Sequence, residues 1–172
     1  MIREYAPIGL IPAAWAMTFA TMIYPGLDTY WIQHMHYFII LFLSGFTVLS
    51  WKEMESPGLG IWRKVIAAGI IFTGSGTLSF AFEQYSSVLG FLSLSYWFLA
   101  PGAALYYSSK HMDKYSTLYQ RLAGKSAISY MILILGLYTE LTSLQAVAFT
   151  GIAVVQAASI VTASKLDKQE QS

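Results

Sequence analysis

The segment Tyr24 to Trp51, YPGLDTYWIQHMHYFIILFLSGFTVLSW, joins a turn-forming start to a long apolar run. The apolar part, Ile32 to Trp51, has about the 20 residues that a helix needs to cross the hydrocarbon core of a bilayer. It contains no Lys, Arg, Asp or Glu. The segment therefore predicts a transmembrane helix that begins close to an aqueous boundary.

The composition extends this prediction to the whole chain. Of 172 residues, 56% are hydrophobic and 11% are charged, against roughly 25% charged residues in an ordinary soluble domain. We expect an all-α integral protein of the cell membrane, surrounded by the lipid bilayer, with no nucleic-acid partner. Residues 1–172 are expected to form one transmembrane domain, with spans at 7–24, 32–51, 65–82, 88–109, 127–141 and 146–164.

The connections between the expected spans divide into two kinds. Three are short, PGLDTYW, EQYSS and TSLQ, which predicts three helical hairpins. The longer ones, Lys52 to Lys64 and Lys110 to Ser126, carry most of the Lys and Arg residues, and the remainder lie near the chain ends. All ten basic residues therefore fall on one side, which the positive-inside rule assigns to the cytoplasm together with both termini.

The opposite side carries one acid for each hairpin, Asp28, Glu83 and Glu140, at intervals of about 55 residues. A hairpin repeat and a plain up-down bundle both explain this interval. Glu140 has two interpretations. It belongs to the last helical turn if the fifth span continues to Leu144, and otherwise it is a hairpin-tip acid in water.

His34 and His36 are candidates for an ionisable role at the outer face. Residues two apart on a helix point about 200° away from each other, so the pair does not bind one metal ion from a single helix face. We expect no metal and no cofactor, although a single histidine as axial haem ligand stays an alternative. The simpler interpretation is an aromatic belt, in which a histidine senses outside pH. The outer belt contains Tyr24, Tyr30, Trp31 and Tyr37, and the inner belt contains Trp51, Trp62, Tyr106, Tyr107, Tyr115 and Tyr119.

Small and hydroxyl-bearing residues mark the third and sixth expected spans. Thr73 and Thr77 lie among the glycines and serines of the third span, and Gly151 and several alanines lie in the sixth. Such residues let helices approach closely, within one chain or in a homo-oligomer, and they also line narrow polar paths. In the fourth span, Pro101 removes a backbone hydrogen bond and predicts a kink. Broken helices expose backbone groups to substrate in transporters.

Catalytic signatures are missing from the sequence. It contains no phosphate-binding loop, dinucleotide fingerprint, nucleophile elbow or zinc-binding spacing, and no cysteine. We therefore predict no catalytic residue and no enzymatic activity.

The segment EYAPIGL, Glu4 to Leu10, resembles the Asn-Pro-Ala-Pro-Leu-Gly-Leu signature that begins the first helix of the acetate uptake transporter family. The matching residues are Ala6, Pro7, Gly9 and Leu10, and Met17 and Thr18 are similar to the family's Met-Thr pair. The resemblance implies a hexamer of six-helix protomers, each with a path for small monocarboxylates. It also implies an aromatic constriction near Trp15.

The function expected from these observations is a small-solute channel or transporter, with acetate-like monocarboxylates as the first candidates. The three outer acids oppose the approach of an anion, which favours the protonated acid, a neutral solute or a cation. A non-catalytic subunit of a larger membrane complex or sensor is the main alternative. The substrate-binding component of a modular vitamin transporter is a third, and an intramembrane haem or lipid enzyme is the last.

Overall fold

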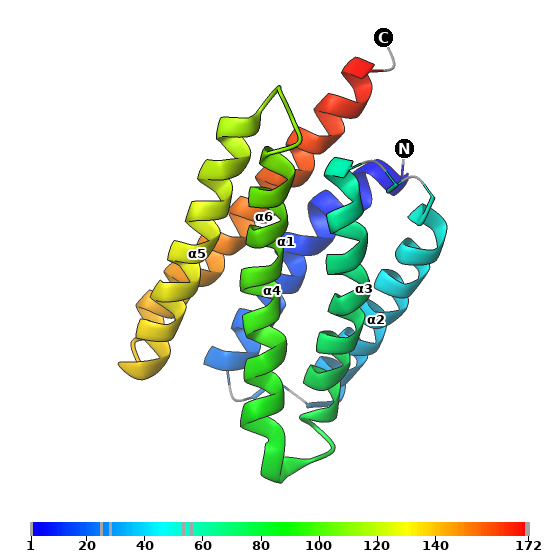
Figure 1. Cartoon of the computed structure of the whole chain (residues 1–172). Helices are drawn as coiled ribbons and strands as arrows, with labels where there is room; N and C mark the ends of the chain where they lie inside the picture. The colour runs from blue at the N-terminus through cyan, green and yellow to red at the C-terminus, as the bar shows by residue number, and fades with distance from the viewer. Residues whose placement is uncertain (1, 25, 28, 53, 56, 171–172) are drawn as a thin grey trace.

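Six α-helices and one 3-10 turn form the described part of the chain in the computed structural model (Figure 1). The structure describes residues 2–24, 26–27, 29–52, 54–55 and 57–170, with side chains for 11–24, 26–27, 30–52, 54–55 and 60–163. The elements are α1 (Ile2–Ile23), α2 (Thr29–Ser50), α3 (Pro57–Leu78), η1 (Glu83–Tyr85), α4 (Ser86–Ser109), α5 (Ser116–Tyr138) and α6 (Thr142–Glu170). The all-α fold class is confirmed for these residues.

Three segments are long and apolar enough to cross a membrane: Tyr30–Ser50, Glu83–Ser109 and Thr142–Ala163. This is the property of an integral membrane protein. The apolar segment Ile11–Ile23 of α1 is shorter. Helices α3 and α5 carry pairs of basic residues in their first halves, which lower their mean hydropathy. The crossing of the bilayer by all six helices stays a prediction.

Two helices begin well before the expected spans. Helix α3 starts at Pro57 rather than near residue 65, and α5 starts at Ser116 rather than near residue 127. The expected limits followed the apolar runs, but the helices continue through the basic segments before them. Proline suits the first turn of a helix, because the backbone N–H that it lacks has no helical partner there.

The helices pack in the order α2, α3, α4, α5, α6, α1, each against the next (Figure 1). The second and third expected hairpins, α3 with α4 and α5 with α6, are therefore confirmed as packed pairs. The first is wrong, because in the described part of the chain α1 packs against α6, and α2 packs against α3. A short connection limits the distance between helix ends but does not make the helices pack along their lengths.

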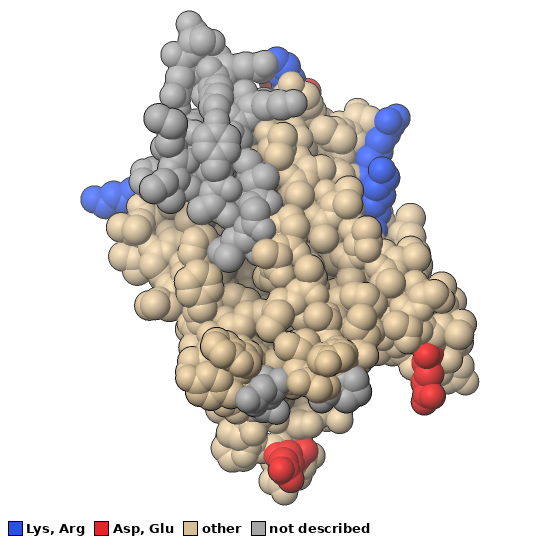
Figure 2. Space-filling model, turned by 180° about the vertical axis from the view of Figure 1, so that it is seen from behind, with Lys and Arg blue, Asp and Glu red and all other residues tan. Residues whose placement is uncertain are grey.

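The two chain ends lie at the same end of the bundle (Figure 1). We call this the basic end, because it also carries the α2–α3 and α4–α5 connections with their Lys and Arg residues. On the face shown in Figure 2, basic side chains occupy the half nearer the termini, and acidic side chains mark the opposite, acidic end. The one-sided charge pattern is thus confirmed for the described side chains, whereas the side of the membrane stays a prediction.

Two apolar clusters form the core. The first contains Trp15, Phe98, Leu133, Ala148, Phe149 and Ile152, and the second, nearer the basic end, contains Leu105, Tyr119, Leu122 and Val155. Tyr119 was expected in the inner aromatic belt, but it is buried and its hydroxyl donates a hydrogen bond to the Ser159 carbonyl oxygen at 3.3 Å. It lies inside because the start of α5 is helical and packs against α6.

The absence of natural cysteines allows a direct test of this topology. We expect single variants Lys110→Cys and Glu83→Cys to react with an impermeant maleimide from opposite sides of a sealed membrane, since α4 separates the two positions. Labelling in intact and inverted vesicles measures this. Reaction of both positions from the same side would contradict a crossing by α4.

Candidate functional site

Pro101 deprives one carbonyl group of its helical hydrogen bond. In an α-helix the carbonyl of residue 97 accepts from the N–H of residue 101, and proline has no N–H. Helix α4 nevertheless continues through Pro101. The side chain of Gln156, from α6, takes the place of the missing donor, because its Nε2 donates to the Trp97 carbonyl oxygen at 2.9 Å.

The oxygen of the Gln156 amide forms a hydrogen bond with α1. Its Oε1 accepts a hydrogen bond from Trp15 Nε1 at 2.9 Å, and only 6% of Gln156 is exposed. The amide thus donates to α4 and accepts from α1. Burial of an amide without partners is costly, and among the described side chains no buried polar atom lacks a hydrogen bond.

The Trp97 side chain extends the connection to α3. Its Nε1 donates to Thr73 Oγ1 at 3.0 Å, and Thr73 is 3% exposed. Thr77 adds a bond from its own hydroxyl to the Thr73 carbonyl oxygen at 3.1 Å. We call Trp15, Thr73, Trp97 and Gln156 the polar layer. It connects α1, α6, α4 and α3, and Trp97 places it at the middle of α4.

Apolar side chains enclose the polar layer on both sides. The Trp15 ring meets Phe98 and Phe149 edge to face, with centroids 4.9 Å and 5.7 Å away. Val155, beside Gln156 in the chain, belongs to the second core cluster. Burial of Trp15, Thr73 and Gln156 strengthens their hydrogen bonds and raises the cost of leaving one unmade. The layer contains no ionisable side chain, so it offers neutral donors and acceptors only.

Glycines allow the helices to come close enough for these bonds. A Cβ atom on Gly69 would lie 2.5 Å from Trp97 Cζ2, so only glycine leaves room for the indole. In the same way, a Cβ atom on Gly76 would lie too close to the Ser93 side chain, and one on Gly151 too close to the Ser129 side chain. The small residues therefore serve helix packing within one chain. Because α4 and α5 already occupy Gly69, Gly76 and Gly151, these three glycines serve packing within the chain, and oligomerisation through the rest of the small-residue faces stays a prediction.

The structure brings several of the predicted pathway residues together. Trp15 and Thr73 belong to the polar layer, and Thr77 adjoins it. Pro101 leaves the Trp97 carbonyl without a helical donor, and Gln156 donates to that carbonyl instead. Three other predicted residues, Pro7, Gly9 and Leu10, lie in α1 outside the described side chains.

Gln156 and Trp97 are not among the residues that the sequence predicts for a site. The available signal was an uncharged amide within an otherwise apolar last helix, and a residue four positions before a proline. A pairing between them requires knowledge of how α4 and α6 align.

The predicted outer acids do not form one site in the described structure. Glu83 begins η1 and is exposed, and Asp28 lies outside the described residues. Glu140 is also exposed and has a left-handed backbone, with φ 56°, just after α5 ends at Tyr138. The hairpin-tip interpretation of Glu140 is therefore confirmed, and a place within the last helical turn is wrong.

His34 and His36 face different surroundings, as their spacing predicted. His34 is exposed, and its Nδ1 lies 2.7 Å from the Tyr30 carbonyl oxygen. His36 is half-buried, and its ring meets Phe80, just after the end of α3, edge to face at 5.3 Å between centroids. No group of three His, Cys, Asp or Glu side chains lies together in the part of the chain with described side chains.

The two best-formed hollows among the described residues are shallow and lie apart from the polar layer. One is an apolar groove of about 320 Å³ on α3 and α4, between Phe72, Tyr96 and Leu99. The other lies at the acidic end, along residues 81–84. No residue of the polar layer lines either hollow. Neither of these two hollows therefore opens onto the layer.

Comparison with protein-family models, curated proteins and solved structures finds no match to this chain.

Replacement of Gln156 by leucine should destabilise the protein by about 1–3 kcal/mol, because the Trp97 carbonyl loses its donor. Pro101→Ala restores a backbone N–H at that carbonyl. The double variant Gln156→Leu/Pro101→Ala should therefore lose less stability than the sum of its single variants. Denaturation in detergent micelles measures the cycle. Gln145→Leu is the control, since Gln145 donates to a different carbonyl, that of Gly136. Strict additivity for Gln156 and Pro101 would contradict the pairing.

Gly69→Ala should lower stability by about 1–3 kcal/mol, because its Cβ overlaps the Trp97 indole. The matched control is Gly74→Ala in the same helix, where nothing lies within 4 Å of the new Cβ. The control should be neutral or stabilising by up to about 1 kcal/mol, since alanine favours a helix over glycine. The same thermal midpoint for both variants would show that Trp97 does not pack against Gly69.

Proposed function

We propose that the protein is a membrane channel or transporter for a small neutral polar solute, and that the polar layer is its closed solute site. The observation that carries the proposal is the chain of hydrogen bonds that joins four helices at mid-depth in an otherwise apolar bundle. Polar side chains at this depth are costly and are often functional. A solute with its own donor and acceptor can replace the Gln156 partners one for one.

The chemistry of the layer favours an uncharged solute. Trp15 and Gln156 supply N–H donors, Gln156 and Thr73 supply oxygen acceptors, and no charge is present to balance an ion. A protonated carboxylic acid has one donor and one acceptor, which matches the two ends of an amide. Exposed Glu83 and Glu140 at the acidic end also disfavour an approaching anion.

The resemblance to the acetate uptake transporters supports the same proposal from another direction. It implies an aromatic constriction near Trp15, and Trp15 is the member of the polar layer contributed by α1. We therefore propose small monocarboxylic acids, carried in the protonated form, as the first substrates to test. The proposal includes six crossings, cytoplasmic termini, the cell membrane and assembly into an oligomer through faces other than the occupied glycines.

Opening of the layer requires movement of α1 or α3. Because α1 packs against α6, and α2 packs against α3, the two ends of the helix series are not packed together in the described part of the chain. A small outward movement of α1 breaks the bond from Trp15 to Gln156 without unpacking α4 from α5. This arrangement places an end helix of the series next to the bond that closes the proposed site.

A non-catalytic subunit of a larger membrane complex is the second candidate, and one observation favours it. Helix α2 packs mainly against α3 in the described part of the chain, and a long series of its large side chains is exposed: Tyr30, Trp31, Tyr37, Phe38, Leu41, Val48 and Leu49. A partner helix would cover this face as well as lipid does. Stoichiometric copurification of another membrane protein, lost on Leu41→Ala/Val48→Ala, would favour this candidate.

Proteoliposomes that contain the purified protein should take up labelled acetate faster than empty liposomes. Uptake at fixed total acetate should rise about tenfold for each pH unit lost above the acetate pKa, because the protonated fraction rises by that factor. The excess over empty liposomes measures protein-dependent uptake. Glycerol and urea serve as neutral comparison solutes.

Trp15→Phe removes the indole N–H but keeps an aromatic ring, so it should change the protein-dependent uptake by about tenfold. Trp31→Phe is the control, because Trp31 is 62% exposed and lies outside the layer. Uptake equal to that of empty liposomes for every solute would overturn the transport proposal. Equal effects of the two substitutions would show that the polar layer is not the solute site.

A further inference from the structure

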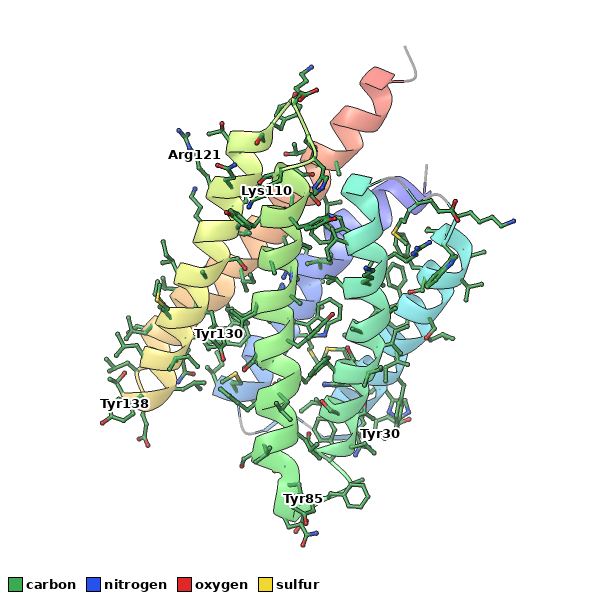
Figure 3. The ribbon with its side chains drawn as sticks, viewed as in Figure 1. Tyr30, Tyr85, Lys110, Arg121, Tyr130 and Tyr138 are labelled. Atoms are coloured by element: carbon green, nitrogen blue, oxygen red, sulfur yellow. The ribbon has the colours of Figure 1, made fainter. Side chains whose placement is uncertain are left out.

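One face of α5 is exposed, with basic side chains at one end and apolar side chains along most of the rest. Helix α5 packs against α4 and α6, and its remaining face makes no contact with another described helix. We call the residues along it the α5 outer face: Arg121, Gly124, Lys125, Ile128, Met131, Leu135 and Tyr138. In Figure 3, Arg121 lies near the basic end and Tyr138 at the acidic end, both directed away from the bundle.

The two cations of the α5 outer face lie one helical turn apart. Arg121 and Lys125 have the four-residue spacing that places side chains side by side. Both are exposed, and neither forms an ion pair with an acid among the described side chains. Gly124 lies between them with nothing within 4 Å of its Cβ position, which leaves open space beside the two charges. Two other cations near this end are engaged with aromatic rings, because Arg63 stacks on Trp51 at 4.5 Å and Lys110 on Tyr106 at 4.6 Å.

The rest of the face is apolar over the length of one lipid leaflet. Ile128, Met131 and Leu135 are all exposed, with Met131 at 61%. The distance from Lys125 to Leu135 along the helix is about 15 Å. This equals half of the roughly 30 Å hydrocarbon core of a bilayer. The cations therefore lie at headgroup depth when the apolar residues lie in the acyl region.

We propose that the α5 outer face binds a phospholipid with an anionic headgroup. The phosphate lies between Arg121 and Lys125, above the space left by Gly124, and an acyl chain lies along Ile128, Met131 and Leu135. This assignment rests on the insertion of α5 in the bilayer but not on transport of any solute. Charge complementarity selects the headgroup, because juxtamembrane Lys and Arg residues attract anionic lipids.

A second copy of the chain fits the α5 outer face poorly. Two copies in one membrane have the same orientation, so a two-fold contact between these faces would bring Arg121 and Lys125 of both copies to the same depth. Four cations would then meet without an acid on the face to pair with them. An anionic lipid neutralises the pair instead.

Native mass spectrometry of the full chain in detergent, titrated with phosphatidylglycerol or with phosphatidylcholine of the same acyl chains, tests the assignment. The wild-type protein should bind phosphatidylglycerol more tightly. Arg121→Gln/Lys125→Gln should weaken phosphatidylglycerol binding by about fivefold for each charge, hence by about twenty-fivefold in total, and should leave phosphatidylcholine binding unchanged.

The matched control is Lys52→Gln/Lys64→Gln, which removes two exposed charges from the same end but from the α2–α3 connection and α3. It should change phosphatidylglycerol binding by less than about twofold. An equal loss in both double variants would overturn the proposal, since general surface charge would then explain the binding. Loss of a dimer in the α5 variant at unchanged lipid affinity would also overturn it and identify a second copy as the occupant. Because no flux is measured, the outcome is independent of the transport proposal.

Discussion

The backbone N–H that Pro101 lacks is the constraint on which the interior of this protein depends. An unpaired carbonyl in the middle of a membrane protein is costly, since no water reaches it. Gln156 satisfies the Trp97 carbonyl and thereby fixes the register of α6 against α4. Its remaining oxygen then fixes Trp15 of α1. A single proline thus explains why an amide lies in the centre of the last helix.

Charged and neutral polar side chains occupy different depths of the bundle. Described charges lie at the two ends, and the middle contains neutral hydrogen-bonding groups enclosed by aromatic and aliphatic side chains. Charges at the ends anchor helices in headgroups at low cost, whereas a charge in the middle would require a buried counter-ion. The polar layer therefore contrasts with the charge relays of ion pumps. The proposed solute is therefore an uncharged one.

The sequence predicts the parts of this structure that depend on composition and spacing. It predicts helices, the gathering of Lys and Arg at one end, the different faces of His34 and His36, and a break in the helical hydrogen bonds at Pro101. Trp15 was singled out only by the resemblance to the acetate uptake transporters. The sequence does not predict that α1 packs against α6, or that Gln156 reaches Trp97, because these depend on how helices distant in the chain align. The starts of α3 and α5 were misplaced for another reason: helices continue through basic residues whose charged ends extend into water.

The exchange of indole N–H protons with solvent, followed by NMR in lipid nanodiscs, tests the central claim most directly. That claim is a closed, dry polar layer held by Gln156. The account predicts that the N–H protons of Trp15 and Trp97 exchange at least about a hundredfold more slowly than that of exposed Trp31, because their bonds must break and water must enter first. Exchange of Trp15 or Trp97 at the rate of Trp31 would contradict it.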